Sequence, residues 1–187
     1  MESILFEIYK DKRTVFRLVD VAMLLPRRDN RNLSNGLNYY VRTGKLLSLR
    51  RGIFAKSEYD PEELACSLYT PSYLSLEYVL QKAGVVFQFD SRYTIVSYLN
   101  REIDIDGNRF CFRVIKGTNY IDRKGLVTRN NINIATPERA FLDVLYLNKD
   151  YYFDNINPID KDAVYKILPS YNSAALTRRV NKLFDHG

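Results

Sequence analysis

The chain has 187 residues and a net charge of +6, and this basic excess favours an anionic partner. Hydrophobic residues make up 46% of the sequence, which suffices for one large core or two small ones and excludes a wholly disordered chain. No apolar run reaches the roughly 18 residues of a membrane helix, and the N-terminus lacks the pattern of a secretory signal, so we expect a cytoplasmic protein without a membrane partner.

The first sixty residues begin with two predicted helices. A first helix is expected within residues 2–10. A second is expected over residues 16–25, because apolar side chains recur there at helical spacing, and Pro26 ends it. The residues of its expected inward stripe are Leu18, Val21, Ala22 and Leu25.

A third helix is predicted over residues 31–43, after a turn at residues 27–30. Gly44 stands at the position where glycine commonly ends a helix. Gly36, in the middle, costs about 1 kcal/mol relative to Ala; it either permits a close approach to another backbone or has no consequence. The expected inward residues are Leu33, Leu37, Tyr40 and Val41, and the expected outward residues are Arg31, Asn35, Asn38, Tyr39 and Arg42.

The stretch GKLLSLRRGIFAK, residues 44–56, alternates like a β-hairpin. Its expected inward residues are Leu47, Leu49, Ile53 and Ala55. Arg50 and Arg51 then stand at the tip, beside Gly52. A helix, a turn, a polar-faced helix and a basic hairpin follow one another in a winged helix-turn-helix, so we predict such a domain over residues 1–60.

Basic charge is concentrated in this part of the chain. Residues 1–60 hold 12 Lys or Arg against 7 Asp or Glu, whereas residues 61–187 hold 16 against 15. Within residues 26–56, Asp29 is the one acidic residue among eight basic ones. Such clustering is typical of a nucleic-acid-binding surface, while a solvated face usually mixes both signs.

We therefore predict that this domain binds double-stranded DNA, with the third helix in the major groove and the hairpin at a backbone or minor groove. Winged helices also serve as protein-interaction modules, which is the alternative. The predicted DNA contacts are Arg27, Arg28, Arg31, Asn35, Asn38, Tyr39, Arg42, Lys45, Arg50 and Arg51.

Residues 61–187 are predicted to form an α+β domain with a mixed or antiparallel sheet and terminal helices. Asp60 is expected to cap a helix that starts at Pro61. A second helix is expected within residues 70–84, with Ser72 or Ser75 as its cap. A hairpin turn is predicted at residues 106–108. The predicted strands are residues 85–89, 93–99, 109–116 and 126–135.

Another helix is predicted from Pro137, with Thr136 as its N-cap. Its expected buried face consists of Phe141, Leu142, Leu145 and Tyr146. Glu138, Arg139 and Asp143 are expected to form a charged network on its surface. Two further helices, within residues 160–169 and 171–184, end the chain.

The sequence does not favour an enzyme. His186, the single histidine, stands next to the C-terminus, where neither a Ser-His or Cys-His system nor a zinc site is expected. Cys66 and Cys111 form no metal or redox motif and are expected to be buried thiols. Asp104 and Asp106 flank a predicted turn, and no acidic group matches a metal-dependent nuclease, the remaining enzymatic alternative. We predict no catalytic residue, metal or cofactor.

Three stretches carry a resemblance to a known family: LLSLRRGIFAK, PSYLSLEYVLQKAG and INIATPERAFLDVLYL. In this order and spacing the chain resembles the AbiEi antitoxins over residues 14–147. These are the transcriptional-regulator half of bacterial type IV abortive-infection systems, which act in phage defence. The chain departs from longer members in a short C-terminal part and in the helix predicted before the winged helix.

The resemblance implies an N-terminal winged helix that represses its own operon, and a C-terminal domain needed for antitoxin activity. It also implies a nucleotidyltransferase-like toxin as partner, bound directly or counteracted indirectly. The expected operator contains inverted repeats, read by a monomer or weak dimer that binds cooperatively. The alternatives are a stand-alone transcriptional regulator and an interaction module that holds the toxin without regulating its operon.

Overall fold

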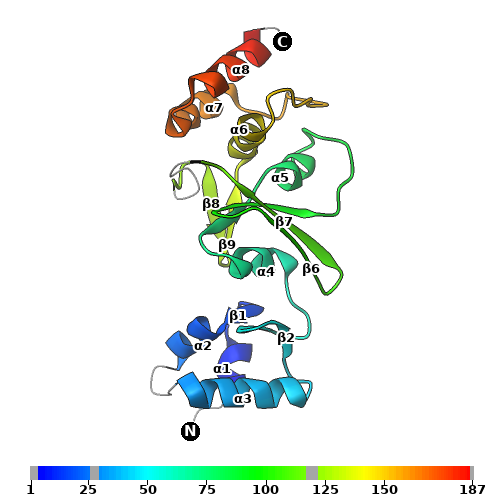
Figure 1. Ribbon diagram of the computed structural model, residues 1–187, viewed down its shortest axis with the longest axis vertical. Helices are drawn as coiled ribbons and strands as arrows, with labels where there is room; N and C mark the ends of the chain where they lie inside the picture. Colours follow the sequence, from blue (N-terminus) through cyan, green and yellow to red (C-terminus); the bar gives the residue numbers. More distant parts are fainter. Residues whose placement is uncertain (1–3, 26–29, 117–121, 186–187) are drawn as a thin grey trace. The chain divides into compact units, whose positions relative to one another are not determined.

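The computed structural model describes residues 4–25, 30–116 and 122–185. The chain divides into two compact units, Met1–Leu68 and Tyr69–Gly187. Together they contain helices and two separate sheets, so the expected α+β class is confirmed (Figure 1). Among the described residues, no helix combines the length and the apolar character needed to cross a membrane.

The first unit places helices around a small sheet (Figure 1). Its three strands are antiparallel and lie in the order β1-β3-β2. Strand β1 was not predicted: Phe16 and Arg17, expected at the start of a helix, instead pair with β3. The elements are α1 (Ile4–Lys10), β1 (Val15–Arg17), α2 (Leu18–Leu24), α3 (Asn30–Arg42), β2 (Leu47–Arg50), β3 (Ile53–Ala55) and α4 (Pro61–Leu68).

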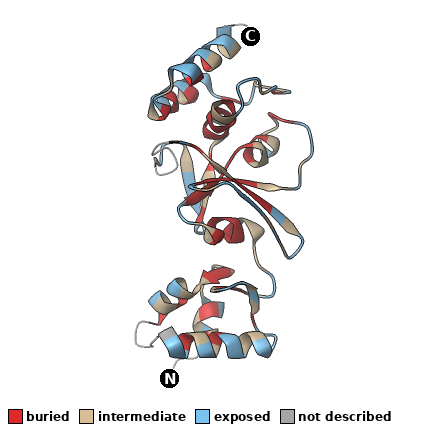
Figure 2. Ribbon diagram, viewed as in Figure 1, coloured by how far each residue is buried: buried red, intermediate tan, exposed pale blue. Residues whose placement is uncertain are grey.

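The core of this unit forms where α1, α2 and α3 meet the sheet. The predicted stripe of the second helix is confirmed in part: Val21 and Leu25 are buried, while Leu18 and Ala22 are half-buried and pack against the core. Figure 2 shows α3 with a buried side and an exposed side. The buried members of the core are Ile4, Ile8, Phe16, Val21, Leu25, Leu33, Leu37, Leu46 and Phe54.

Helix α4 lies with the first unit, which ends at Leu68. Asp60 accepts a hydrogen bond from the backbone N–H of Glu62, as expected of an N-cap. The buried Glu63 carboxylate accepts from the N–H groups of Thr14 and Val15, at 2.6 and 2.9 Å, and from the Thr14 hydroxyl at 2.7 Å. One side chain thus joins α4 to the start of β1.

The second unit is built on a six-stranded mixed sheet of order β6-β7-β5-β4-β9-β8. The β5–β7 and β4–β9 pairs are parallel and the other pairs are antiparallel. The elements are β4 (Ser72–Leu74), α5 (Glu77–Lys82), β5 (Tyr93–Ser97), β6 (Arg101–Ile105), β7 (Asn108–Val114), β8 (Leu126–Arg129), β9 (Ile132–Ala135), α6 (Pro137–Leu147), α7 (Lys161–Ile167), the 3-10 helix η1 (Leu168–Tyr171) and α8 (Ala174–Asp185).

Helix α6 begins as predicted. The Thr136 hydroxyl accepts from the backbone N–H of Arg139, and Pro137 occupies the first helical position. Phe141, Leu142 and Leu145 are buried, while Tyr146 is half-buried and packs against the same core. Both C-terminal helices are also present, as α7 and α8.

The prediction of one helix over residues 70–84 is wrong in its first half. Residues Ser72–Leu74 form the buried central strand β4, paired with β5 on one side and β9 on the other. Leu76 then takes a positive φ of 59°, and α5 starts only at Glu77. Pairing with strands from distant parts of the chain overrides the local helical pattern here.

Two predicted strands also differ. Residues 85–89 form no strand: Val85 and Val86 are buried just after α5, where the Val85 N–H bonds the Leu80 carbonyl. Residues 126–135 form two antiparallel strands, β8 and β9. Asn130 and Asn131 both take positive φ, which suits a two-residue hairpin turn.

Candidate nucleic-acid interface

Helix α3 presents the predicted polar face. Its inward residues Leu33 and Leu37 are fully buried, and Tyr40 and Val41 pack half-buried against the same core. The outward residues are all exposed: Arg31, Asn35, Asn38, Tyr39 and Arg42. Guanidinium, amide and phenol groups therefore share one solvent-facing side of a 13-residue helix.

Helix α1 supports α3 from the side opposite this polar face. A Cβ added at Gly36 would lie 2.5 Å from Cδ1 of Ile4, so the absence of a side chain lets the two helices approach. The close approach that Gly36 permits is to a side chain of α1 rather than to its backbone. The helix predicted before the winged helix is thus part of the first core.

The end of α3 leads directly into the hairpin. Gly44 has a φ of 71°, and the N–H groups of Lys45 and Leu46 bond back to the Tyr40 carbonyl. The Tyr9 hydroxyl donates to the Lys45 carbonyl at 3.0 Å and ties this link to α1. Tyr9 was not among the predicted site residues, because only the fold brings it within reach of residue 45.

The hairpin has the predicted orientation. Ile53 and Ala55 are buried, Leu47 and Leu49 are half-buried, and Phe54 is buried as well because β3 is the central strand of its sheet. Gly52 takes a φ of 76° at the turn, and its carbonyl accepts from the N–H of Leu18, so the tip is anchored to α2. A register shift between Ser48 and Arg50 bends the strand just before the tip.

The predicted basic residues occupy three different situations. Arg27 and Arg28 lie outside the described residues. Lys45, Arg50 and Arg51 are exposed, as are Arg31 and Arg42 on α3. Lys56, one of the eight basic residues of the charged segment, serves the fold instead: its ammonium donates to the Asp11 carbonyl at 2.7 Å and lies over the ring of Phe16.

Ion pairs distinguish these cations from the other arginines of the unit. Arg13 pairs with Asp11 at 2.6 Å and Arg17 with Asp20 at 2.9 Å. The hydrogen bond from Arg13 lowers the pKa of the Asp11 carboxyl. Within the described part of the chain, no such pair is formed by the four exposed cations Arg31, Arg42, Lys45 and Arg51. All four side chains face solvent.

A second polar cluster lies in the other unit and corrects a prediction. Arg139 and Asp143, expected on the surface of α6, are both fully buried, and their nearest ion-pair atoms are 3.4 Å apart. Glu138 does not join them, and its carboxylate instead accepts from the N–H of Asp160 at 3.4 Å. The predicted surface network is therefore wrong, because the strands beside α6 cover its charged positions.

The partners of this buried pair come from β4, from η1 and from two loop residues, Ser75 and Lys124. The Asp143 carboxylate accepts from the hydroxyls of Tyr73 at 3.0 Å, Ser75 at 2.7 Å and Tyr171. The Arg139 guanidinium donates to the Tyr73 hydroxyl at 3.1 Å and to the carbonyl of Lys124 at 2.9 Å. Tyr73 lies on β4 and Tyr171 on η1, so the cluster fastens both to α6.

Burial controls the acid–base behaviour of the cluster. It raises the pKa of the Asp143 carboxyl, against the opposing influence of the Arg139 guanidinium and the three hydroxyl donors. It also raises the pKa values of Tyr73 and Tyr171, which the neighbouring carboxylate raises further. With no exposed surface on either charged side chain, the cluster cannot touch a substrate or DNA, and its geometry is that of a structural ion pair.

The remaining polar groups are the two thiols and the side chains of types that bind metals. Cys66 and Cys111 are buried free thiols, as expected. Over the described ranges, the structure contains no group of three or more His, Cys, Asp or Glu residues arranged to hold a metal ion. Comparison of the chain with protein-family models and with curated proteins found no match.

Proposed function

We propose that residues 1–60 form a winged helix-turn-helix that binds double-stranded DNA. The order α1, β1, α2, α3, β2, β3 supports this, since a helical pair is followed by a two-stranded wing. The observation that carries the proposal is the shared exposure of the polar face of α3 and of the cationic hairpin tip, without ion pairs for Arg31, Arg42, Lys45 and Arg51 within the described residues.

The two parts of this surface have different roles. On α3, the Asn35 and Asn38 amides and the Arg42 guanidinium are suited to base edges in the major groove. On the hairpin, Arg50 and Arg51 are suited to phosphates or to the minor groove. Leu47, Ile53 and Ala55 anchor the two strands beside the tip, so Arg50 and Arg51 are held out from a packed base.

We further propose, from the resemblance to AbiEi antitoxins, that the chain represses its own operon and counteracts a nucleotidyltransferase-like toxin. Two of the resembling stretches, PSYLSLEYVLQKAG and INIATPERAFLDVLYL, supply both sides of the buried cluster through Tyr73, Ser75, Arg139 and Asp143. The two stretches therefore pack against each other in the second unit.

The test of DNA binding is a gel shift with the region upstream of the chain's own gene. A specific complex at low salt is expected for the unchanged protein. The variant R50A/R51A should bind more weakly at every sequence, and its log–log salt slope should shrink by about 0.9 for each phosphate that the variant no longer neutralises. An unchanged salt slope would exclude the wing from the interface. If no complex forms at low salt, DNA binding is contradicted and a protein-interaction module is the alternative function.

Three further experiments separate the remaining functions. A footprint that spans two half-sites is expected if copies bind cooperatively, whereas one half-site at saturation contradicts paired binding. Co-expression of the chain with the product of the adjacent gene tests the antitoxin role by growth, and a pull-down from those cells distinguishes direct binding from indirect neutralisation. Incubation of the DNA with Mg²⁺ or Mn²⁺ tests for nuclease activity, for which intact DNA is expected.

A further inference from the structure

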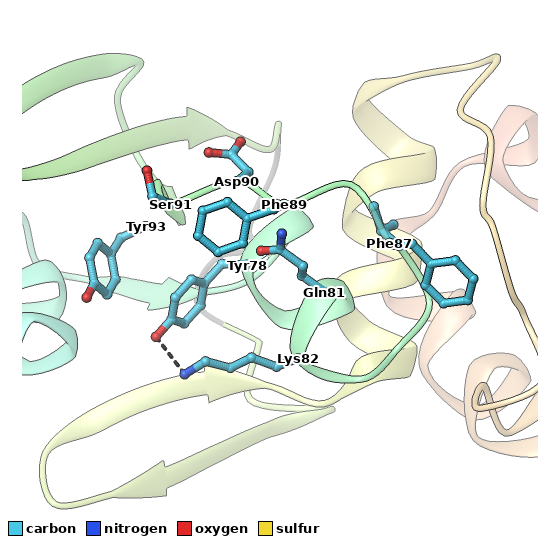
Figure 3. A pocket seen from close by; sticks show the side chains of 9 residues that line it. Tyr78, Gln81, Lys82, Phe87, Phe89, Asp90, Ser91 and Tyr93 are labelled. Carbon is cyan, nitrogen blue, oxygen red and sulfur yellow. Dashed lines mark hydrogen bonds between the residues drawn. The ribbon is translucent and has the colours of Figure 1, made fainter.

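The polar groups of two surfaces differ in whether the chain itself bonds them. In a groove of the second unit, the Lys82 ammonium donates to the Tyr78 hydroxyl at 2.7 Å (Figure 3). Asp90 lines the same groove and pairs with Arg92 at 2.6 Å. The charged side chains of this groove are therefore already engaged, which sets it apart from the polar side of α3.

Two amides on α3 are not engaged in this way. Asn35 and Asn38 are exposed, and neither side chain forms a hydrogen bond with another described residue. Each amide can accept a hydrogen bond through its oxygen while it donates through its nitrogen. The two side chains therefore fit a ligand that presents a donor next to an acceptor.

The two amides belong to a narrow stripe of exposed side chains. At 3.6 residues per turn, positions 31, 35, 38 and 42 of α3 fall within roughly 60° of one another around the helix axis. Leu33 and Leu37 lie on the other side of the helix and are fully buried, so the stripe faces away from the core. The stripe consists of Arg31, Asn35, Asn38 and Arg42, and all four are exposed.

The charge of this helix suits a polyanion. Between Asn30 and Arg42 the sequence has two arginines and no acidic residue. Arg31 and Arg42 stand at the two ends of the stripe, with the uncharged amides between them. Duplex DNA presents the complementary pattern, because phosphates flank the uncharged base edges of the major groove.

The spacing of the two amides matches the spacing of base pairs. A rise of about 1.5 Å per residue places Asn35 and Asn38 about 4.5 Å apart along the axis of α3. Successive bases of a DNA strand are about 3.4 Å apart along the duplex axis. In the major groove, the two amides therefore meet neighbouring base pairs rather than the same pair or pairs two steps apart.

Adenine is the base whose major-groove edge matches an amide. It presents the N7 acceptor beside the N6 amino donor, so an asparagine bonds it in two places. The Tyr39 ring follows Asn35 by one turn of α3, is 53% exposed, and makes an edge-on contact with the Tyr40 ring at 5.5 Å. An apolar surface at this place suits the methyl group of the thymine in the same base pair.

We propose that α3 reads two successive A·T pairs, with Asn35 at one adenine and Asn38 at the next, and that Arg42 reads a guanine beyond them. Arg42 lies about 6 Å further along the helix axis than Asn38, which corresponds to about two base-pair steps. Arginine bonds guanine at O6 and N7, the commonest specific contact in the major groove. The inference rests on the proposed DNA-binding function and names the class of sequence that is bound.

The experiment selects duplexes from a random library with the full-length chain. Enriched duplexes are expected to contain two neighbouring A·T pairs with a G·C pair beyond them. Asn35→Ala and Asn38→Ala should each lose the preference at one of the two A·T positions, and neither weakens the helix, because alanine is the best helix former. The control Asn157→Ala removes an exposed amide of the second unit and should leave the preference unchanged.

Modified bases then test the contacts atom by atom. Enriched sites with 7-deazaadenine, which has carbon in place of N7, should bind the unchanged protein about fivefold more weakly or worse. The variant N35A/N38A should not respond to this replacement. Uracil in place of thymine removes the methyl group and should weaken the unchanged protein but not Tyr39→Ala.

The outcomes separate this inference from the function on which it rests. If the unchanged protein binds no duplex at low salt, DNA binding itself is contradicted. If it binds duplexes but enriches no neighbouring A·T pairs, the inference is overturned while DNA binding stands. The same holds if N35A/N38A responds to 7-deazaadenine as the unchanged protein does, because the amides then do not contact N7.

Discussion

Arg51 and Arg139 are the same side chain in opposite surroundings. Arg51 is exposed at the tip of the β2–β3 hairpin and forms no ion pair among the described residues. Arg139 is fully buried and contacts a carboxylate, a phenol and a backbone carbonyl. The charge of Arg51 faces solvent, whereas the charge of Arg139 interacts with groups inside the protein. Whether an arginine contributes to the fold or to the surface thus depends on its burial.

The strongest test of this contrast is Arg139→Met. It leaves the Asp143 carboxylate buried without its cation, which typically costs about 3–5 kcal/mol. Urea unfolding would measure the loss in the free energy of unfolding. Hydrogen exchange should become faster in peptides from the second unit. The double variant R139M/D143L should recover most of it, because a buried pair replaced by apolar groups is often neutral. A single variant as stable as the unchanged protein would mean that the buried pair contributes little.

A buried carboxylate in the first unit tests whether the cost of removing a charged side chain depends on its burial rather than on the unit that contains it. Glu63→Ala leaves the N–H groups of Thr14 and Val15 without their acceptor, and we expect a loss of about 1–3 kcal/mol in the free energy of unfolding. Hydrogen exchange at these two amides localises the effect. Glu58→Ala is the exposed control and should be neutral. Equal losses in both variants would contradict the argument from burial.

The exposed side of the comparison is tested by Arg51→Ala. Its effect on the free energy of unfolding should stay within about 0.5 kcal/mol, while its DNA complex should weaken because one phosphate is no longer neutralised. Arg178→Ala, an equally exposed arginine on α8, should change neither quantity. Stability and DNA affinity are measured on the same preparations, so that a fall in stability would reassign Arg51 to the fold.

The smallest effect is expected at an ion pair between these extremes, Asp11 with Arg13. The pKa of Asp11 is lowered in the folded chain, so the pair stabilises the fold above the ordinary pKa of an aspartate, about 3.9. Asp11→Asn should therefore be less stable at pH 7 by under about 1 kcal/mol. The difference should vanish as the pH falls through the folded pKa of Asp11, and chemical unfolding at pH 7 and pH 2 checks it. A difference that persists at low pH would indicate a role other than charge.

Much of the candidate interface could be predicted because its signals are local. The spacing of Leu33 and Leu37 determines which side of α3 faces water, and Gly44 determines where the helix ends. The cluster of basic residues in the 26–56 segment is visible without any fold. The sequence did not reveal the contacts that hold this surface in place from distant positions. These are Tyr9 with the Lys45 carbonyl, Ile4 with Gly36, and Lys56 with the Asp11 carbonyl.

The second unit shows where local signals end. Thr136 and Pro137 start α6, as predicted from their side chains. Asn130 and Asn131 form a turn between β8 and β9, which the apolar pattern had predicted as a single strand. Residues Ser72–Leu74 carry a pattern compatible with either helix or strand, and pairing with β5 and β9 selects the strand. Nothing near residue 139 in the sequence distinguishes an exposed arginine from a buried one.

The sequence alone therefore determined the apolar inward faces of α3 and α6, the cap of α6 and the concentration of positive charge, because each depends on residues a few positions apart. The tertiary structure decided which polar groups are hidden and which apolar groups are left in water. Tyr73 and Asp143 are 70 positions apart and meet only because β4 lies against α6, and that contact turns a predicted surface network into a buried one. Phe87 and Phe89, expected in a strand, remain exposed because no strand pairs with their segment in the described structure.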